Sequence, residues 1–281
     1  MTDLSLLQEF EFRAWPDQVE LRESAGPALE SMGALSVSLN RNRNRTRNRN
    51  RNRNRNRAHG ALQGSGTDGF DILEPWRERA ALHALRDDWK DLPLALPPGL
   101  PTLRAQALDL LEKQYLLSLP QSAGRRDEIL REARLELSGY LRPFGIESHG
   151  GYDATIALML TVIALTDEIG LYYKARWNVP RPNQVEPRLR PFLAAPAHAS
   201  YPSNHAFQSF SVAFIMSRVL PEHPGSGQLF LSARRIAENR EWAGVHYACD
   251  TQAGHALARM LLPVLEEVLE DNMLAARAEW Q

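Results

Sequence analysis

Apolar residues recur at helical spacing from about residue 71 to the C-terminus, and no stretch of the chain shows convincing strand alternation. Proline-rich stretches break this pattern at 93–101 and 180–202. The periodic segments are 74–91, 103–118, 125–141, 153–177, 204–219, 228–241 and 250–275. Because each amphipathic helix must bury its apolar face against another element, the pattern predicts an all-α, single-core helical bundle. With 281 residues, 43% of them hydrophobic, the chain is large enough to bury a sizeable core.

A low-complexity tract separates the N-terminal residues from the predicted bundle. Residues 40–57 alternate Asn and Arg, with nine arginines and no acid, and residues 58–69 are rich in Gly, Ala and Ser. Such a tract has nothing to bury and repels itself, so we expect 40–69 to be disordered. The predicted organisation is an N-terminal segment at 1–39, the tract and linker at 40–69, and a helical catalytic domain at 70–281 with its motifs in 150–275.

The arginine tract also dominates the distribution of charge. The whole chain has a net charge of −1, but outside 40–57 it has 24 basic and 34 acidic residues. Arginine neutralises phosphates, so nucleic-acid binding through the tract is an alternative function. No aromatic residue interleaves the arginines, which argues against stacking on single strands. We expect no obligate nucleic-acid partner.

Other features bear on the compartment. The single cysteine, Cys249, excludes an internal disulfide framework and a cysteine-rich zinc site. The longest apolar run, 154–165, has twelve residues, which is too short to span a bilayer. The N-terminus has early acids and no long apolar stretch, so it does not read as a signal peptide. The sequence therefore predicts a soluble, cytoplasmic protein without a transmembrane segment.

Three short segments in the C-terminal half combine cationic, hydroxyl and imidazole side chains. They are KARWNVPRP from Lys174 to Pro182, YPSNH from Tyr201 to His205, and NREWAGVHYACD from Asn239 to Asp250. The cations Lys174, Arg181 and Arg240 could surround a tetrahedral oxyanion. Ser203 stands where an amphipathic run begins, so its hydroxyl and the following N–H groups would face an anion at a helix N-terminus.

The two histidines add reactive groups to this predicted anion site. His246 and Asp250 are four residues apart and share a face of a helical turn, so the carboxylate can hold one ring nitrogen and leave the other free to attack. His205 falls in the first turn after Ser203. Each residue alone has an ordinary structural role as a cap, surface group or structural pair, and their joint spacing carries the prediction. An anion cradle with an oriented imidazole and a second imidazole is what phosphoryl transfer through a phospho-histidine needs.

The three segments together resemble the signature of the type 2 phosphatidic acid phosphatase superfamily, which includes bacterial acid phosphatases, lipid phosphatases and vanadium-dependent haloperoxidases. The matching positions are Lys174, Arg181, Pro182, Pro202, Ser203, His205, Arg240, His246 and Asp250. The resemblance covers about residues 150–275 and implies a helical bundle of the acid phosphatase/vanadium haloperoxidase type. Asn204 stands where the superfamily usually has Gly, and Asn239 where it usually has Ser. We expect these two departures to affect rate and pocket shape rather than the existence of the site.

The resemblance implies a role for each matching side chain. His246 would be the nucleophile, Asp250 would fix its tautomer, and His205 would protonate the leaving alcohol and then activate water. The phosphate oxygens would be bound by Lys174, Arg181, Ser203, the N–H of Asn204 and Arg240. This route needs neither a metal nor a cofactor, and its substrate would be a small phosphate ester.

The haloperoxidase branch remains the principal alternative because the cradle is common to both. There vanadate would be the cofactor, His246 its single protein ligand, and hydrogen peroxide and halide the substrates. His198, seven residues before His205, resembles a bromoperoxidase residue and could border a halide pocket. The compact length favours an acid-phosphatase-like phosphomonoesterase, and the lack of an adequate membrane span disfavours the lipid phosphatases. The substrate and the oligomeric state are left open.

Overall fold

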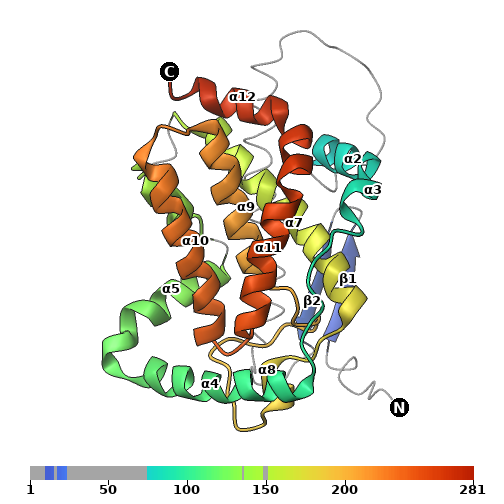
Figure 1. The fold of residues 1–281 in the computed structure, drawn as a ribbon, viewed down its shortest axis with the longest axis vertical. Coiled ribbons are helices and arrows are strands. Elements are labelled where there is room, and N and C mark those ends of the chain that lie inside the picture. The colour runs from blue at the N-terminus through green and yellow to red at the C-terminus, as the bar shows by residue number, and fades with distance from the viewer. Residues whose placement is uncertain (1–9, 16–17, 24–74, 135, 148–150) are drawn as a thin grey trace. The chain divides into compact units, whose positions relative to one another are not determined.

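The computed structural model describes residues 10–15, 18–23, 75–134, 136–147 and 151–281 (Figure 1). Contacts between residues divide the chain into two units, Met1–Leu62 and Gln63–Gln281. From residue 75 onward the described residues form helices and contain no strand, which confirms the all-α class for this part of the chain. The predicted disorder of 40–69 lies outside the described residues, so it stays a prediction.

An antiparallel hairpin in the first unit is a feature that the sequence analysis missed. Strand β1 (Phe10–Trp15) pairs with β2 (Gln18–Glu23), and the register places Phe12 opposite Leu21. Apolar residues occupy alternate positions in both strands, which is the two-residue period of a sheet. Each strand has only six residues, so the alternation is too brief to stand out against a mixed composition.

The second unit is a helical bundle. Its elements are α2 (Trp76–Ala84), α3 (Arg86–Trp89), α4 (Leu100–Ser118), α5 (Ala123–Ala133), α6 (Ser138–Leu141), α7 (Asp153–Trp177), α8 (Pro182–Val185), α9 (Asn204–Val219), α10 (Pro224–Trp242), α11 (Ala248–Val268) and α12 (Glu270–Ala278), with 3₁₀ turns at Pro120–Ser122 and Arg142–Phe144. Helices α7 and α9 have the predicted bounds. The predicted helices at 125–141 and 250–275 are each divided, because apolar periodicity continues across a break and cannot locate it.

Helix α9 is the central element, and it packs against α7, α10 and α11 (Figure 1). Phe207 and Met216 are among its fully buried residues. Gly254 of α11 allows a close approach at the start of α9, since a Cβ there would lie 2.5 Å from the Ser203 carbonyl oxygen and 2.8 Å from Ala206 Cβ. The N-terminus of α9 is therefore pressed directly against α11.

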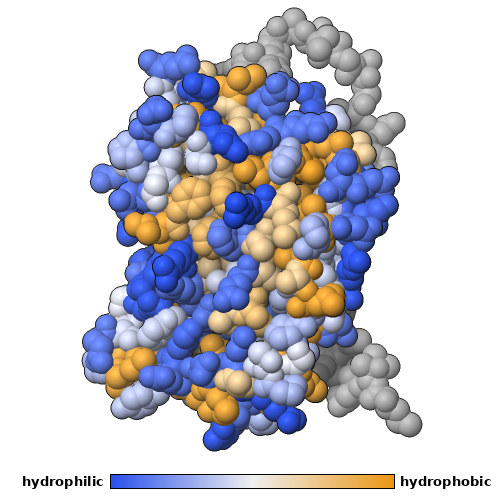
Figure 2. All heavy atoms as spheres, in the orientation of Figure 1, coloured by the Kyte–Doolittle hydropathy of each residue, from blue (hydrophilic) through white to orange (hydrophobic). Residues whose placement is uncertain are grey.

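Helix α7 belongs to a segment, Asp153–Val185, that is long and apolar enough to cross a membrane by length and composition. The sequence-based expectation that the chain has no segment of this length and composition is not upheld. That expectation considered only the uninterrupted apolar run 154–165, whereas the apolar residues continue beyond it between scattered polar ones. Of the most apolar window, 56% is buried within the protein, and α7 packs against α9 and α12. Hydrophilic and hydrophobic residues interleave over the face of the molecule shown in Figure 2.

The C-terminal residues hold the start of α7 in place. The Glu279 carboxylate accepts hydrogen bonds from the backbone N–H groups of Ala154 (2.5 Å) and Thr155 (2.8 Å) and from the Thr155 hydroxyl (2.8 Å). Trp280 Nε1 donates to the same hydroxyl at 3.0 Å. The first N–H groups of a helix lack intrahelical partners and favour negative charge, so Glu279 acts as a cap supplied from the far end of the chain.

Candidate active site

His246 and Asp250 form a directed pair at the start of α11. Asp250 Oδ2 lies 2.9 Å from His246 Nδ1, and it also accepts from the Ser200 hydroxyl at 2.5 Å and from the Tyr247 N–H at 3.1 Å. His246 Nε2 lies 3.2 Å from Arg181 Nη1. When Nδ1 donates to a carboxylate, Nε2 is the basic nitrogen, so the pair presents a nucleophilic lone pair toward Arg181.

Arg181 is the N-cap residue of α8, directly before Pro182, and its guanidinium is anchored by backbone oxygens. Nη1 donates to the Val245 carbonyl at 2.6 Å, and Nε donates to the His198 carbonyl at 3.1 Å. Nη2 lies 3.0 Å from His198 Nδ1. Arg181 is therefore held between His246 and His198, and the structure brings all three together.

Lys174, near the C-terminal end of α7, is buried at 1% exposure. Its ammonium group donates to the carbonyl oxygens of Ala199 (3.1 Å), Ser200 (2.7 Å) and Pro202 (2.5 Å). An ammonium group has three donors, so these bonds use all of them. Burial, and then the nearby Arg181, lower the pKa of Lys174 to about 7. Lys174 thus shapes the loop before α9 besides supplying positive charge.

Ser203 and His205 lie at the N-terminus of α9. The Ser203 hydroxyl accepts from the Ala206 N–H at 3.4 Å, which makes Ser203 the N-cap that the sequence predicts. His205 Nε2 is buried and has no hydrogen-bond partner among the described residues. A buried, unpaired ring nitrogen is costly, so it is available to a group that enters the site.

Arg240 is 1% exposed and forms an ion pair with Glu132 of α5. Its Nη2 also donates to the Ile129 carbonyl at 3.2 Å, while its Nε is buried without a partner among the described residues. Asn239 Nδ2 donates to Glu132 Oε1 at 2.7 Å, so the residue that departs from the superfamily pattern orients the partner of Arg240.

Sequence reasoning missed Glu132. A signal for it exists in the i, i+4 spacing of Glu128 and Glu132 on one face of α5. Glu128 forms an ion pair at 2.8 Å with Arg235 of α10. Arg235 lies five residues before Arg240 on the same helix. Burial raises the pKa of the Glu132 carboxyl, against the effect of the Arg240 charge.

Burial and nearby positive charges lower the pKa of both imidazoles. Burial lowers the pKa of His205 well below its usual value, and the charges of Arg240, Lys174 and Arg181 lower it further. Burial, followed by Lys174 and Arg181, does the same for His246. Both rings are therefore neutral near pH 7, and the positive charge around them favours an anion.

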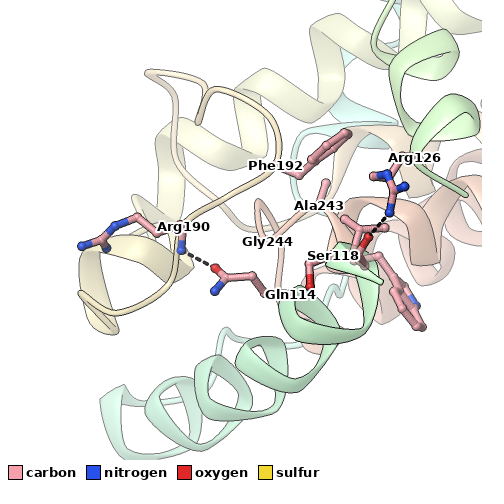
Figure 3. Close-up of a pocket in the computed structure, with 9 residues that line it drawn as sticks. Gln114, Ser118, Arg126, Arg190, Phe192, Ala243 and Gly244 are labelled. Carbon is pink, nitrogen blue, oxygen red and sulfur yellow. Dashed lines mark hydrogen bonds between the residues drawn. The ribbon is translucent and has the colours of Figure 1, made fainter. Parts of the chain in front are cut away.

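Two cavities border this region. One of about 440 Å³ is lined by Arg181, His198, Asn178, Asn183 and neighbouring loop residues, so it adjoins the cradle. Another of about 310 Å³ lies where α4 meets the turn before His246, and Figure 3 shows Gln114, Arg126, Phe192 and Gly244 around it. None of the predicted site residues lines this second cavity.

The donor set suits an oxyanion rather than a metal cation. Among the residues that the structure describes, no group of three or more His, Cys, Asp or Glu side chains could hold a metal ion. Three buried cations, two neutral imidazoles and a helix N-terminus instead form an arrangement with the chemistry to bind an oxyanion.

Comparison with known proteins agrees with this class. Residues 154–273, which include every predicted site residue, match the family model described as the PAP2 superfamily. This region is therefore similar to the PAP2 superfamily, the group of type 2 phosphatidic acid phosphatases that its motifs resemble.

Among solved structures, the chain is similar to one titled the first transmembrane PAP2 type phosphatidylglycerolphosphate phosphatase from Bacillus subtilis. The two are 17% identical with a TM-score of 0.44, and the similarity covers 70% of this chain and 97% of the other. A comparison with curated proteins finds no match.

Proposed function

We propose that this chain is a phosphoric ester hydrolase that works through a phospho-histidine at His246. The match of residues 154–273 to the PAP2 superfamily model supports a phosphatase-type function. The observation that carries the mechanism is the His246–Asp250 pair, 2.9 Å apart, with Nε2 on the opposite side of the ring accepting from Arg181 Nη1 at 3.2 Å. A nucleophile held in one tautomer next to buried cations is suited to attack phosphorus in a bound phosphate ester.

In the first step, the His246 Nε2 lone pair forms a bond to phosphorus while the bond from phosphorus to the ester oxygen breaks. Arg181 and Arg240 balance the charge that spreads over the phosphoryl oxygens. Burial is the main cause of the low pKa of His205, and the nearby cations lower it further. The negative charge of the bound ester opposes the effect of the cations and raises this pKa, and the proposed step requires the ring to take up a proton as substrate binds. His205 then gives that proton to the leaving alkoxide.

In the second step, a water molecule attacks phosphorus as the bond to His246 Nε2 breaks. His205, now neutral, takes the proton of the water, and orthophosphate leaves. Asp250 stabilises the imidazole through both steps by keeping Nδ1 in its hydrogen bond. The substrate that this proposal requires is a small phosphate monoester.

The test is hydrolysis of a chromogenic phosphate ester by the purified chain, with and without orthovanadate. We expect hydrolysis that vanadate inhibits, an acid-labile phosphoryl group on the protein after rapid quenching, and loss of both in His246→Ala. His255→Gln is the matched control, because His255 is an exposed histidine on α11 outside the site. Hydrolysis that survives His246→Ala would contradict the mechanism.

Vanadium-dependent haloperoxidase activity is the second candidate, and the placement of His198 favours it. His198 Nδ1 lies 3.0 Å from Arg181 Nη2 and the ring borders the 440 Å³ cavity, where a halide pocket is expected. Vanadate is a tetrahedral oxyanion like phosphate, so the same residues would hold it: His246 Nε2 would be the protein ligand, Arg181 and Arg240 would bind the oxygens, and Lys174 would supply positive charge. Vanadate would supply peroxide activation. Bromination of a dye by vanadate-loaded protein, without ester hydrolysis, would establish this function instead.

Two sequence predictions have no support from the structure or the comparisons and stay predictions. One is the cytoplasmic location, which the structure does not support because the segment Asp153–Val185 has the length and apolar composition of a membrane span. The alternative of nucleic-acid binding rests on 40–57, outside the described residues. Deletion of that tract tests the alternative, because the phosphatase proposal expects esterase activity to survive the deletion.

A further inference from the structure

The side chain of Asn204 occupies a space that α7 leaves open for it. Asn204 Nδ2 donates to Asp167 Oδ1 at 3.0 Å. Gly170 lies one turn further along α7, and a Cβ at that position would collide with the Asn204 amide, lying 2.8 Å from its Cγ. Glycine is unfavourable in the interior of a helix, so its presence here has a packing reason. Asn204 fits against α7 because residue 170 has no side chain.

One face of α7 holds the whole segment that carries Ser203 and His205. Asp167, Gly170 and Lys174 are spaced i, i+3 and i+7, so they share a face of the helix. Lys174 holds the backbone before Ser203 through three carbonyl oxygens. Asp167 holds the residue after Ser203. The N-cap of α9 therefore lies between two anchors on the same helix.

Asp167 makes a second bond to α9. Gln208 Nε2 lies 3.5 Å from Asp167 Oδ1 and donates to the Ile163 carbonyl, one turn earlier on α7, at 3.3 Å. The Asp167 side chain is otherwise exposed, and within the described part of the chain no Lys or Arg forms an ion pair with it. Its carboxylate is thus directed at the side-chain amides of the first turns of α9.

We propose that Asp167 is a positioning residue of the phosphate site, which acts through Asn204 to hold the N-terminal turn of α9 against α7. This inference rests on the proposed function. The superfamily usually has Gly at position 204, which has no side chain to anchor. In this chain the Asn204 side chain is held by Asp167 and fits over Gly170. Through this contact the first turn of α9 is positioned, with Ser203, the N–H of residue 204 and His205.

The decisive experiment compares Asp167→Ala in two backgrounds, the native chain and Asn204→Gly. In the native chain we expect Asp167→Ala to lower kcat for the chromogenic ester about tenfold, with a smaller change in KM, and to weaken vanadate inhibition to a similar extent. Asp167→Asn keeps an oxygen acceptor and should restore most of the loss. In Asn204→Gly, where the amide is absent, Asp167→Ala should have almost no further effect.

Two controls separate positioning from stability and from charge. Asp109→Ala removes an exposed helical aspartate on α4 and should leave kcat unchanged. Gly170→Ala should lower the melting temperature of the native chain and be tolerated in Asn204→Gly, because the colliding side chain is gone. A Gly170→Ala variant that melts like the native chain would overturn the proposed fit.

The outcomes also distinguish this inference from the proposed function. Equal losses of kcat from Asp167→Ala in both backgrounds would overturn the positioning role of Asp167 and leave the phosphatase proposal intact. A lower melting temperature with unchanged kcat and vanadate affinity would do the same. A native chain that hydrolyses no ester contradicts the phosphatase. Orthovanadate affinity then becomes the readout in the same two backgrounds. If Asp167→Ala weakens orthovanadate binding equally in both, the positioning role of Asp167 is overturned.

Discussion

The backbone N–H of Ser203 donates to the backbone carbonyl of Asp250 at 3.0 Å. This bond joins the loop before α9, where an anion would be held, to the first turn of α11, which orients His246. Gly254, one turn after Asp250, keeps the two helices close enough for the bond to form. Because the bond uses only backbone atoms, the close packing of α9 on α11 helps to fix the distance between Ser203 and His246, together with the side chains that anchor the loop.

Asp250→Asn should abolish most of the activity without removing the fold. The substitution keeps the shape of the side chain, but its amide can donate to Nδ1 and leave His246 in the wrong tautomer. In other enzymes that hold a histidine this way, the loss is about 10⁴-fold in kcat. We expect a loss of at least about 10³-fold, measured with the chromogenic ester. Ser200→Ala removes one hydrogen bond to the same carboxylate and should cost far less; similar losses in the two variants would contradict the tautomer argument.

Glu132→Ala should destabilise the protein by leaving Arg240 charged and unpaired in the interior. Removal of one partner of a buried ion pair costs about 3–5 kcal/mol of the free energy of unfolding. Urea denaturation measures this loss. The matched control is Glu238→Ala, which breaks an exposed i, i+4 pair with Arg234 and should change the free energy by less than about 0.5 kcal/mol. Orthophosphate should stabilise Glu132→Ala more than the native chain, since it can replace the lost negative charge; equal stabilisation would place Arg240 outside the anion site.

Anion binding should weaken as the pH rises above neutrality. The pKa of Lys174 is lowered to about 7, so the free site carries this charge below pH 7 and loses it above. We therefore expect kcat/KM, which reports the free enzyme, to fall on the alkaline side with an apparent pKa near 7. A bound anion favours the charged ammonium, so the corresponding limb of kcat should lie at higher pH.

Lys174→Arg tests the assignment of that limb, because a guanidinium keeps its charge throughout this range. The alkaline limb of kcat/KM should move upward in this variant, with circular dichroism and the melting temperature as checks on folding. An alkaline limb that keeps its position in a folded Lys174→Arg variant would assign the ionisation to another group.

Glu279→Ala should lower stability while leaving catalysis intact. The substitution removes the carboxylate that accepts from Ala154 and Thr155 at the start of α7, and loss of such a cap costs about 1–2 kcal/mol. Urea denaturation should show this decrease, with Glu267→Ala, an exposed glutamate on α11, as the control. A kcat reduced more than threefold, which is on the order of 0.6 kcal/mol of activation free energy, would contradict this prediction. It would show that a change at the start of α7 alters the position of Lys174 near the other end of the helix.

The sequence by itself determined the class of fold and the chemical groups of the site. Helices α7 and α9 follow from apolar spacing bounded by clear stop and start signals, such as the proline-rich loop after Trp177 and the N-cap Ser203 before Asn204. Both signals are local, since they depend on residues within one or two turns. The spacing of His246 and Asp250 likewise sets a shared face before any tertiary contact is made. Short-range geometry of this kind can be read from a single chain.

Only the tertiary structure decided which partners these groups have. Glu132 meets Arg240 across 108 positions of the chain, and Asp167 meets Asn204 across 37. Lys174 proves to hold the loop backbone, a contact that its residue type does not specify. Helix periodicity states which face of a helix is buried but not which helix covers it, because that depends on how all the faces pack at once. The breaks between α5 and α6 and between α11 and α12 escaped prediction for the same reason: apolar spacing continues through them, and packing alone decides where each helix ends.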